Sequence, residues 1–184
     1  KGANNSNLSA GGLMNAVDSF MDDSDPSNID RIGHRRWCLN PLMGKTGFGA
    51  SNRWSAMWAL DSSKPTVKDL DAVFYPPPGY VPVDLFGPNH AWSIHILKGK
   101  TPRRGDEFEI EVVNLNDHYE PVGDPLELNW KDIAGGNYGQ SPCIVFRPLG
   151  LRVRPGMRYA VKVSLDSGKT VAYEYLVEFV SAPN

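Results

Sequence analysis

Residues 33–41 read GHRRWCLNP, and the glycine-punctuated stretch KTGFGAS follows at residues 45–51. His34 stands between a glycine and two arginines, directly behind a loop rich in aspartate. Imidazole exchanges protons near neutral pH and ligates metals, and guanidinium groups bind anions. This stretch therefore shapes the local fold and also supplies the first candidate for a functional residue, His34.

Upstream of this stretch, apolar side chains recur at helical spacing and predict a helix over residues 8–22. Its apolar positions are Leu8, Leu13, Ala16, Val17, Phe20 and Met21. The aspartates that follow and Pro26 end the helix, because carboxylates are unfavourable at a helix C-terminus and proline restricts the residue before it. A loop is therefore expected to follow this helix.

Further along, the spacing of apolar residues between Ile29 and Leu39 predicts a second, shorter helix that Pro41 stops. Residues 46–50 and 55–60 then predict two strands with a turn at Asn52. The first third of the chain is thus expected to be an α+β unit.

The composition changes between residues 61 and 89, where prolines accumulate: Pro65, Pro76, Pro77, Pro78, Pro82 and Pro88. Such a composition favours an extended, semi-rigid connector, so we expect a domain boundary here. Within it, the segment from Tyr75 to Tyr80 either clamps two modules together or serves as a proline-rich ligand for another protein. The clamp is the interpretation we prefer.

Beyond the connector, turn residues separate short segments that alternate between apolar and polar side chains. The predicted strands are residues 91–97, 107–115, 126–130, 143–147, 158–165 and 171–180. A succession of short strands without a helix predicts a β-sandwich. Tyr159 follows the turn at residues 154–156 and resembles the tyrosine corner of immunoglobulin-like sandwiches, in which the hydroxyl bonds back to the preceding backbone.

The order of the predicted elements, together with GHRRWCLNP, KTGFGAS and the strand SAMWALD at residues 55–61, resembles the second half of a CAP domain, the SCP-like group of secreted proteins. The resemblance covers residues 7–62. It implies an α+β fragment of a CAP-like α/β/α sandwich over residues 1–65. The composition and the strand pattern place a proline-rich connector over 66–90 and an all-β immunoglobulin-like sandwich over 91–184 after it. The resemblance also implies a bacterial-type protein that is secreted, extracellular or attached to the cell envelope.

The resemblance further implies a cleft centred on His34 and lined by acidic residues. Asp23 falls where the family usually has glutamate, three residues after an aromatic position that Phe20 matches. The candidate catalytic residues are His34, Asp23 and Asp22. The candidate ligand-binding residues are His34, Arg35 and Trp37. From the residues alone, a second interpretation stays open, in which His34 caps a helix and bonds to a neighbouring carboxylate.

We expect neither a bound metal nor a cofactor, because a zinc site needs three or four donors and this segment offers one histidine and short carboxylates. Read as a calcium loop from Asp23, the segment has Asn28 where glycine is required and His34 where glutamate is required. Cys38 is expected to be a core residue or half of a disulfide rather than a nucleophile. Whether it pairs with Cys143 is left open.

Lys and Arg number 19 against 21 Asp and Glu, a net charge of −2, which gives no general argument for nucleic acid as a partner. No run approaches the roughly 18 apolar residues of a membrane span, so none is expected. The first residues contain neither an initiator Met nor a signal segment, so the chain reads as a processed or trimmed product.

The predicted function is that of a secreted CAP-domain protein that binds an extracellular glycan, lipid or protein at a cleft near His34. One alternative is a metal-assisted or acid/base hydrolase that uses His34 with Asp22 or Asp23. Another is an adhesion or structural module centred on the β-sandwich. Because so few elements leave apolar faces uncovered, residues 1–62 are expected to pack on the sandwich or on another chain. One candidate partner is the missing N-terminal half of the CAP domain.

Overall fold

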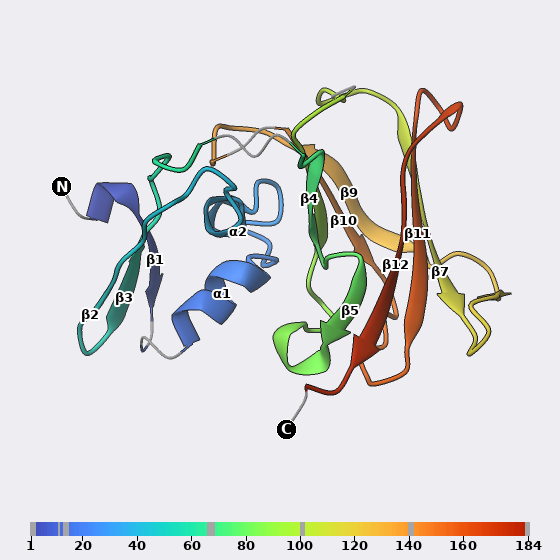
Figure 1. Cartoon of the computed structure of the whole chain (residues 1–184), viewed down its shortest axis with the longest axis horizontal. Helices are drawn as coiled ribbons and strands as arrows, with labels where there is room; N and C mark the ends of the chain where they lie inside the picture. Colours follow the sequence, from blue (N-terminus) through green and yellow to red (C-terminus); the bar gives the residue numbers. More distant parts are fainter. Residues whose placement is uncertain are drawn as a thin grey trace.

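The computed structural model describes residues 3–10, 12, 15–65, 69–99, 102–139 and 142–182. Figure 1 shows its layers from left to right: a three-stranded sheet, two short helices with their loops, and two facing sheets. We call residues 3–65 the N-terminal part and the two facing sheets the sandwich. The helices lie between the three-stranded sheet and the sandwich.

The three-stranded sheet is antiparallel and has the order β1-β3-β2. Its strands are β1 (Ser6–Ala10), β2 (Phe48–Ala50) and β3 (Trp54–Trp58). Asn7 and Met57 pair across β1 and β3 and are buried on the helix side. The opposite face carries exposed apolar side chains, namely Leu8, Trp54 and Trp58.

Residues 6–10 form a strand, whereas the apolar spacing predicted a helix that begins at residue 8. Their backbone pairs with β3 over its whole length, from Ser6 opposite Trp58 to Ala10 opposite Trp54. Tertiary pairing of this kind overrides weak local propensity. The predicted helix survives only as α1 (Ala16–Asp22), and Leu13 lies outside the described residues.

Two short α-helices, α1 and α2 (Gly33–Cys38), cover the inner face of this sheet. Elsewhere, η1 (Ala3–Asn5) and η3 (Val83–Leu85) are 3₁₀ turns. Ala16 and Phe20 of α1 pack with Met57 of β3 in one small buried cluster. The second helix starts later than predicted because Ile32, in the left-handed region with φ of 39°, precedes its first residue.

The predicted fold class, a CAP-like α/β/α sandwich fragment followed by an immunoglobulin-like sandwich, is wrong. The described part of the chain holds three sheets and only two α-helices, and it is mostly β. Both helices lie on one face of the three-stranded sheet (Figure 1). No described helix covers its other face, where Leu8, Trp54 and Trp58 are exposed, so the third layer of an α/β/α arrangement is not formed.

The sandwich consists of a four-stranded sheet ordered β4-β6-β10-β9 and a five-stranded sheet ordered β5-β12-β11-β7-β8. The first contains β4 (Ala72–Tyr75), β6 (Trp92–Ile96), β9 (Leu128–Ala134) and β10 (Cys143–Pro148). The second contains β5 (Gly79–Pro82), β7 (Phe108–Leu115), β8 (Pro121–Val122), β11 (Arg158–Leu165) and β12 (Thr170–Val180). The six strands predicted after residue 90 are all present. The chain adds β4, β5 and β8.

The segment expected to be an extended connector contributes a strand to each sheet of the sandwich. β4 pairs antiparallel with β6, and β5 pairs parallel with β12. The three consecutive prolines, residues 76–78, occupy the link between β4 and β5, where missing backbone donors do not interrupt a ladder. The position of the domain boundary itself stays a prediction.

Aromatic side chains from both sheets fill the interior of the sandwich. Trp92 and Phe146 come from the four-stranded sheet, Tyr159 and Phe179 from the five-stranded sheet, and all four are completely buried. Burying each contributes about 1.5–3 kcal/mol. The Tyr159 hydroxyl donates to the Arg152 carbonyl at 2.9 Å and accepts from the Arg152 N–H at 2.9 Å, as the tyrosine-corner interpretation predicted.

Strand β6 explains how the N-terminal part attaches, because every one of its residues is buried. Trp92, Ile94 and Ile96 belong to the interior cluster of the sandwich. Ser93 and His95 alternate with them, so they point to the other face of the four-stranded sheet. That they too are buried shows that the N-terminal part covers this outer face. The expectation that residues 1–62 pack on the sandwich is confirmed.

Candidate functional site

Arg35 joins the N-terminal part to the sandwich and is completely buried. Its Nε donates to the Met21 carbonyl and its Nη1 to the Ala91 carbonyl, both at 2.6 Å. Nη2 donates to the carbonyl of Asp22 and, at 3.2 Å, to the hydroxyl of Ser24. These contacts turn a predicted ligand-binding guanidinium inward, where it connects α1, α2 and the start of β6.

Arg36, the next residue of α2, makes a second connection and is 1% exposed. Its Nε donates to His95 Nε2 at 3.2 Å, and its Nη1 and Nη2 donate to the carbonyls of Gly135 at 2.6 Å and Gly136 at 2.9 Å. Burial lowers the pKa of both guanidinium groups. We call the pair Arg35 and Arg36 the arginine clamp, because together they hold α2 on the four-stranded sheet.

His34 and Asp23, two predicted site residues, contact each other directly. His34 Nδ1 lies 2.9 Å from Asp23 Oδ1, and the His34 backbone N–H donates to Asp23 Oδ2 at 2.8 Å. The Arg35 N–H reaches the same Oδ2 at 3.3 Å. The Asp23 carboxylate is thus the cap of α2, which satisfies N–H groups that a helix start leaves without partners.

The His34 side chain is 34% exposed, while that of Asp23 is 1% exposed. The imidazole stacks on Phe20 with ring centroids 5.6 Å apart. The prediction of a partly accessible His34 with Asp23 in contact agrees with this geometry. Its role in binding or catalysis stays a prediction, as does that of Trp37, which is half-buried at the far end of α2 beside Gly139.

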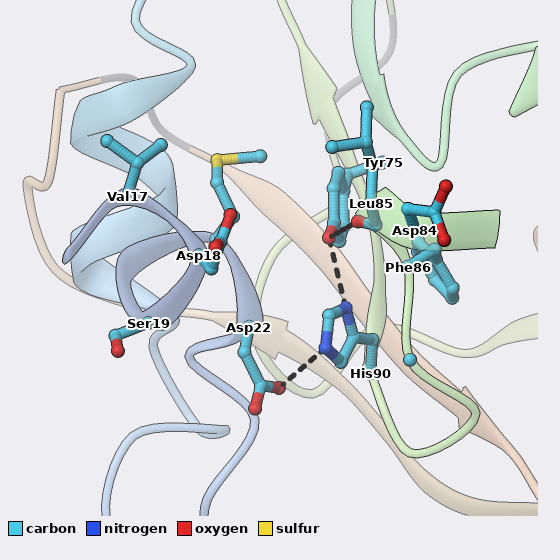
Figure 2. A pocket seen from close by; sticks show the side chains of 11 residues that line it. Val17, Asp18, Ser19, Asp22, Tyr75, Asp84, Leu85, Phe86 and His90 are labelled. Carbon is cyan, nitrogen blue, oxygen red and sulfur yellow. Dashed lines mark hydrogen bonds and ion pairs between the residues drawn. The ribbon is translucent and has the colours of Figure 1, made fainter. Parts of the chain in front are cut away.

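A cavity of about 720 Å³ opens between α1 and the segment around η3. Its lining comes from both parts of the molecule: Val17, Asp18, Ser19, Met21 and Asp22 on one side, and Tyr75, Asp84, Leu85, Phe86, Gly87 and His90 on the other. Figure 2 shows α1 facing Tyr75 and His90 across this space. Of the predicted catalytic residues, Asp22 lines it, whereas His34 and Asp23 do not.

The polar groups of this cavity form a chain. The Tyr75 hydroxyl lies 3.0 Å from His90 Nδ1 and 3.3 Å from the Leu85 carbonyl. His90 Nε2 lies 3.6 Å from Asp22 Oδ1, and both contacts are drawn in Figure 2. The contact between Tyr75 and His90 is a hydrogen bond. The distance between His90 and Asp22 is too long for one, so that contact is electrostatic. Tyr75 therefore fixes the imidazole while its other nitrogen faces the Asp22 carboxylate.

Burial shifts the titration of both rings away from the charged forms. It lowers the pKa of His90, against the opposing effect of the Asp22 carboxylate. It raises the pKa of Tyr75 to about 12. The Arg35 guanidinium packs over the Tyr75 ring, 4.3 Å from the ring centroid. At neutral pH the cavity therefore presents a neutral phenol, and its nearest formal charges are carboxylates and Arg35.

Gly87 allows His90 to take this position. A Cβ at residue 87 would lie 2.8 Å from His90 Nε2, closer than side chains normally approach. The backbone N–H of His90 bonds to the Gly87 carbonyl at 3.1 Å, which tightens the same turn. This turn stands directly before β6, so a rigid strand positions it.

Sequence reasoning missed Gly87 and His90 as site residues. The available signal was the run Gly87-Pro88-Asn89-His90, a second histidine in a turn ahead of a buried strand. Nothing in the chain order indicated that it faces Asp22, because the two meet only when the N-terminal part packs on the sandwich.

Cys38 and Cys143 are both free thiols, and burial raises the pKa of each to about 12. Among the described residues, no group of three or more His, Cys, Asp or Glu side chains is placed to hold a metal ion. Within the same residues, no helix has the length and apolar character needed to cross a membrane. Comparison of the chain with protein-family models and with curated proteins finds no match.

Proposed function

We propose that the protein is a binding module that holds its ligand in the cavity between α1 and the η3 segment. The resemblance of residues 33–41 to CAP domains supports an extracellular or cell-envelope setting for it. The observation that carries the proposal is the cavity itself, about 720 Å³ in volume, within the roughly 300–1,000 Å³ of ligand sites. The N-terminal part and the sandwich both contribute to its walls, so its shape depends on their packing.

The chemistry of the cavity favours binding over catalysis. A nucleophile needs a lowered pKa or an adjacent base that takes its proton. The Tyr75 hydroxyl lies beside a base, His90, but burial raises the pKa of the phenol to about 12 and lowers the pKa of the imidazole, so proton transfer between them is unfavourable. Among the described residues, the lining contains no Cys, Lys or Thr and a single serine, Ser19. Fixed polar groups beside apolar walls are instead typical of a site that orients a ligand.

The Asp23–His34 pair is the observation that favours the hydrolase alternative, since a carboxylate can orient a histidine base. The same carboxylate already caps α2, and Asp22 faces His90 rather than His34. Capping therefore accounts for Oδ2, while Oδ1 holds the imidazole in place.

A blocked cavity tests the proposal. Val17 lines the cavity and is 42% exposed, so Val17→Trp should fill it; Val171 on β12 is 51% exposed and gives the matched control Val171→Trp. The probes are 2-phenylethylammonium, 2-phenylethanol, phenylacetate and cellotriose. Their binding is detected by the methyl NMR signals of Met21 and Leu85. We expect at least one probe to shift both signals, and Val17→Trp alone to abolish the effect. If no probe shifts them, or if Val17→Trp changes nothing, the proposal fails.

A further inference from the structure

The cavity is acidic on its α1 side. Asp18 and Asp22 are one helical turn apart, so their side chains lie on the same face of α1. Both carboxylates act electrostatically on His90 and on Tyr75 across the cavity. Figure 2 shows the two aspartates on the helix that faces these rings.

The negative charge of this wall is not neutralised by a direct ion pair with lysine or arginine in the described part of the chain. Asp18 has no hydrogen bond or ion pair there, and Asp22 has only the 3.6 Å contact with His90. Arg35 interacts electrostatically with the Asp22 carboxylate, but its N–H groups donate to main-chain carbonyls and to serine hydroxyls. His90 is mostly neutral at pH 7 because burial lowers its pKa.

Beside this charge the cavity offers apolar surface that is open to solvent. Val17 is 42% exposed and Leu85 is 62% exposed, and Met21 and Phe86 continue the lining. A ligand that covers apolar side chains of this size removes their surface from water, which favours binding. The ligand is thus expected to present an apolar body to Leu85 and Val17 and a polar group to Asp18 and Asp22.

We propose that the cavity selects an organic cation, an ammonium or guanidinium group attached to an apolar body. This inference rests on the proposed function and deepens it. The cation would lie against Asp18 and Asp22, where it completes carboxylates that lack a cationic partner, while an anion would be repelled by them. The same chemistry occurs in a free amine and in a lysine or arginine side chain of a peptide.

A charge-matched pair of probes tests the inference. 2-Phenylethylammonium and the neutral 2-phenylethanol are similar in size, so calorimetric titration of each at pH 7.5 isolates the effect of charge. We expect the cation to bind about tenfold tighter, and Asp18→Asn to weaken it about threefold to fivefold while leaving the alcohol unchanged. Glu174→Gln, an exposed site on β12, is the control and should change neither affinity. Added salt should weaken only the cation.

Two outcomes overturn the inference in different ways. If the alcohol binds as tightly as the ammonium and Asp18→Asn has no effect, charge selection is wrong while the cavity remains a binding site. If no probe of any charge binds, the proposed function fails together with it. The source of the cation follows from comparing the ammonium probe with acetyl-Phe-Lys-amide. If the peptide binds more tightly, the cation of the natural ligand is a basic side chain. If the free amine binds more tightly, the ligand is a small molecule. Both outcomes support the inference.

Discussion

Asp23 shows how one carboxylate sets the start of a helix and the position of the candidate histidine. Its residue is 4% exposed, and it accepts from two consecutive backbone N–H groups, His34 and Arg35, while it pairs with the imidazole. A six-residue helix has few hydrogen bonds of its own, so this cap is a large share of its stability. His34, by comparison, adds a single side-chain contact with Asp23.

The two residues should therefore differ when each is removed. We expect Asp23→Ala to lower the free energy of unfolding by about 2–3 kcal/mol, because it leaves buried N–H groups without an acceptor. His34→Ala should cost about 1 kcal/mol, because the ring is partly exposed and water can replace it. Urea denaturation of both variants measures the difference. Equal losses would mean that the imidazole, and not the cap, is what Asp23 supports.

His95 gives the fold a defined dependence on pH. It is 3% exposed, and its Nε2 accepts from the guanidinium of Arg36, so its protonation is opposed by burial and by both clamp arginines. These effects lower its pKa from 6.5 to about 3. Between those values the unfolded chain binds a proton that the folded protein excludes, so stability falls as the pH falls.

The expected loss is about 2 kcal/mol in the free energy of unfolding between pH 6.5 and pH 5. His90, whose pKa is also lowered by burial, adds to it in the same direction. His95→Gln keeps a side-chain acceptor for Arg36 but does not titrate, so its stability should change less over this range. Denaturation curves at several pH values provide the measurement. Parallel curves for the two proteins would show that His95 is protonated in the folded state.

At the scale of elements, strands that alternate locally were predictable and strands defined by distant partners were not. Residues 107–115 and 158–165 alternate clearly, and both are strands within one residue of the prediction. β1 carries helical apolar spacing, and only its pairing with β3 makes it a strand. β4 was hidden because it runs directly into three prolines.

The candidate catalytic residues named from the sequence lie around α2, and of them only Asp22 lines the cavity. GHRRWCLNP correctly marked a segment in which His34 and an aspartate meet. The pattern could not show that Arg35 and Arg36 turn inward. Which faces of a helix are buried depends on the elements that pack against it, and the local sequence does not reveal them. Tyr75 and His90 belong to the sandwich, and no sequence period connects them to α1.

For the whole molecule, the cavity exists because the arginine clamp holds the N-terminal part on the four-stranded sheet. The Ala91 N–H reports this packing directly, since it donates at 2.8 Å to the hydroxyl of Ser24 across the boundary. The same hydroxyl accepts from Arg35. Removing the guanidinium would leave the carbonyls of Met21 and Ala91 without this donor, which is strongly unfavourable in a buried site.

Hydrogen exchange at the Ala91 amide therefore tests this account most directly. In the unaltered protein the amide should be protected. Arg35→Met should make it exchange at least tenfold faster, while the amides of β11, paired on both sides by β7 and β12, keep their protection. Arg31→Met, which removes a partly exposed guanidinium, is the control and should leave Ala91 protected. Rapid exchange at Ala91 in the unaltered protein, or unchanged protection in Arg35→Met, would contradict the account.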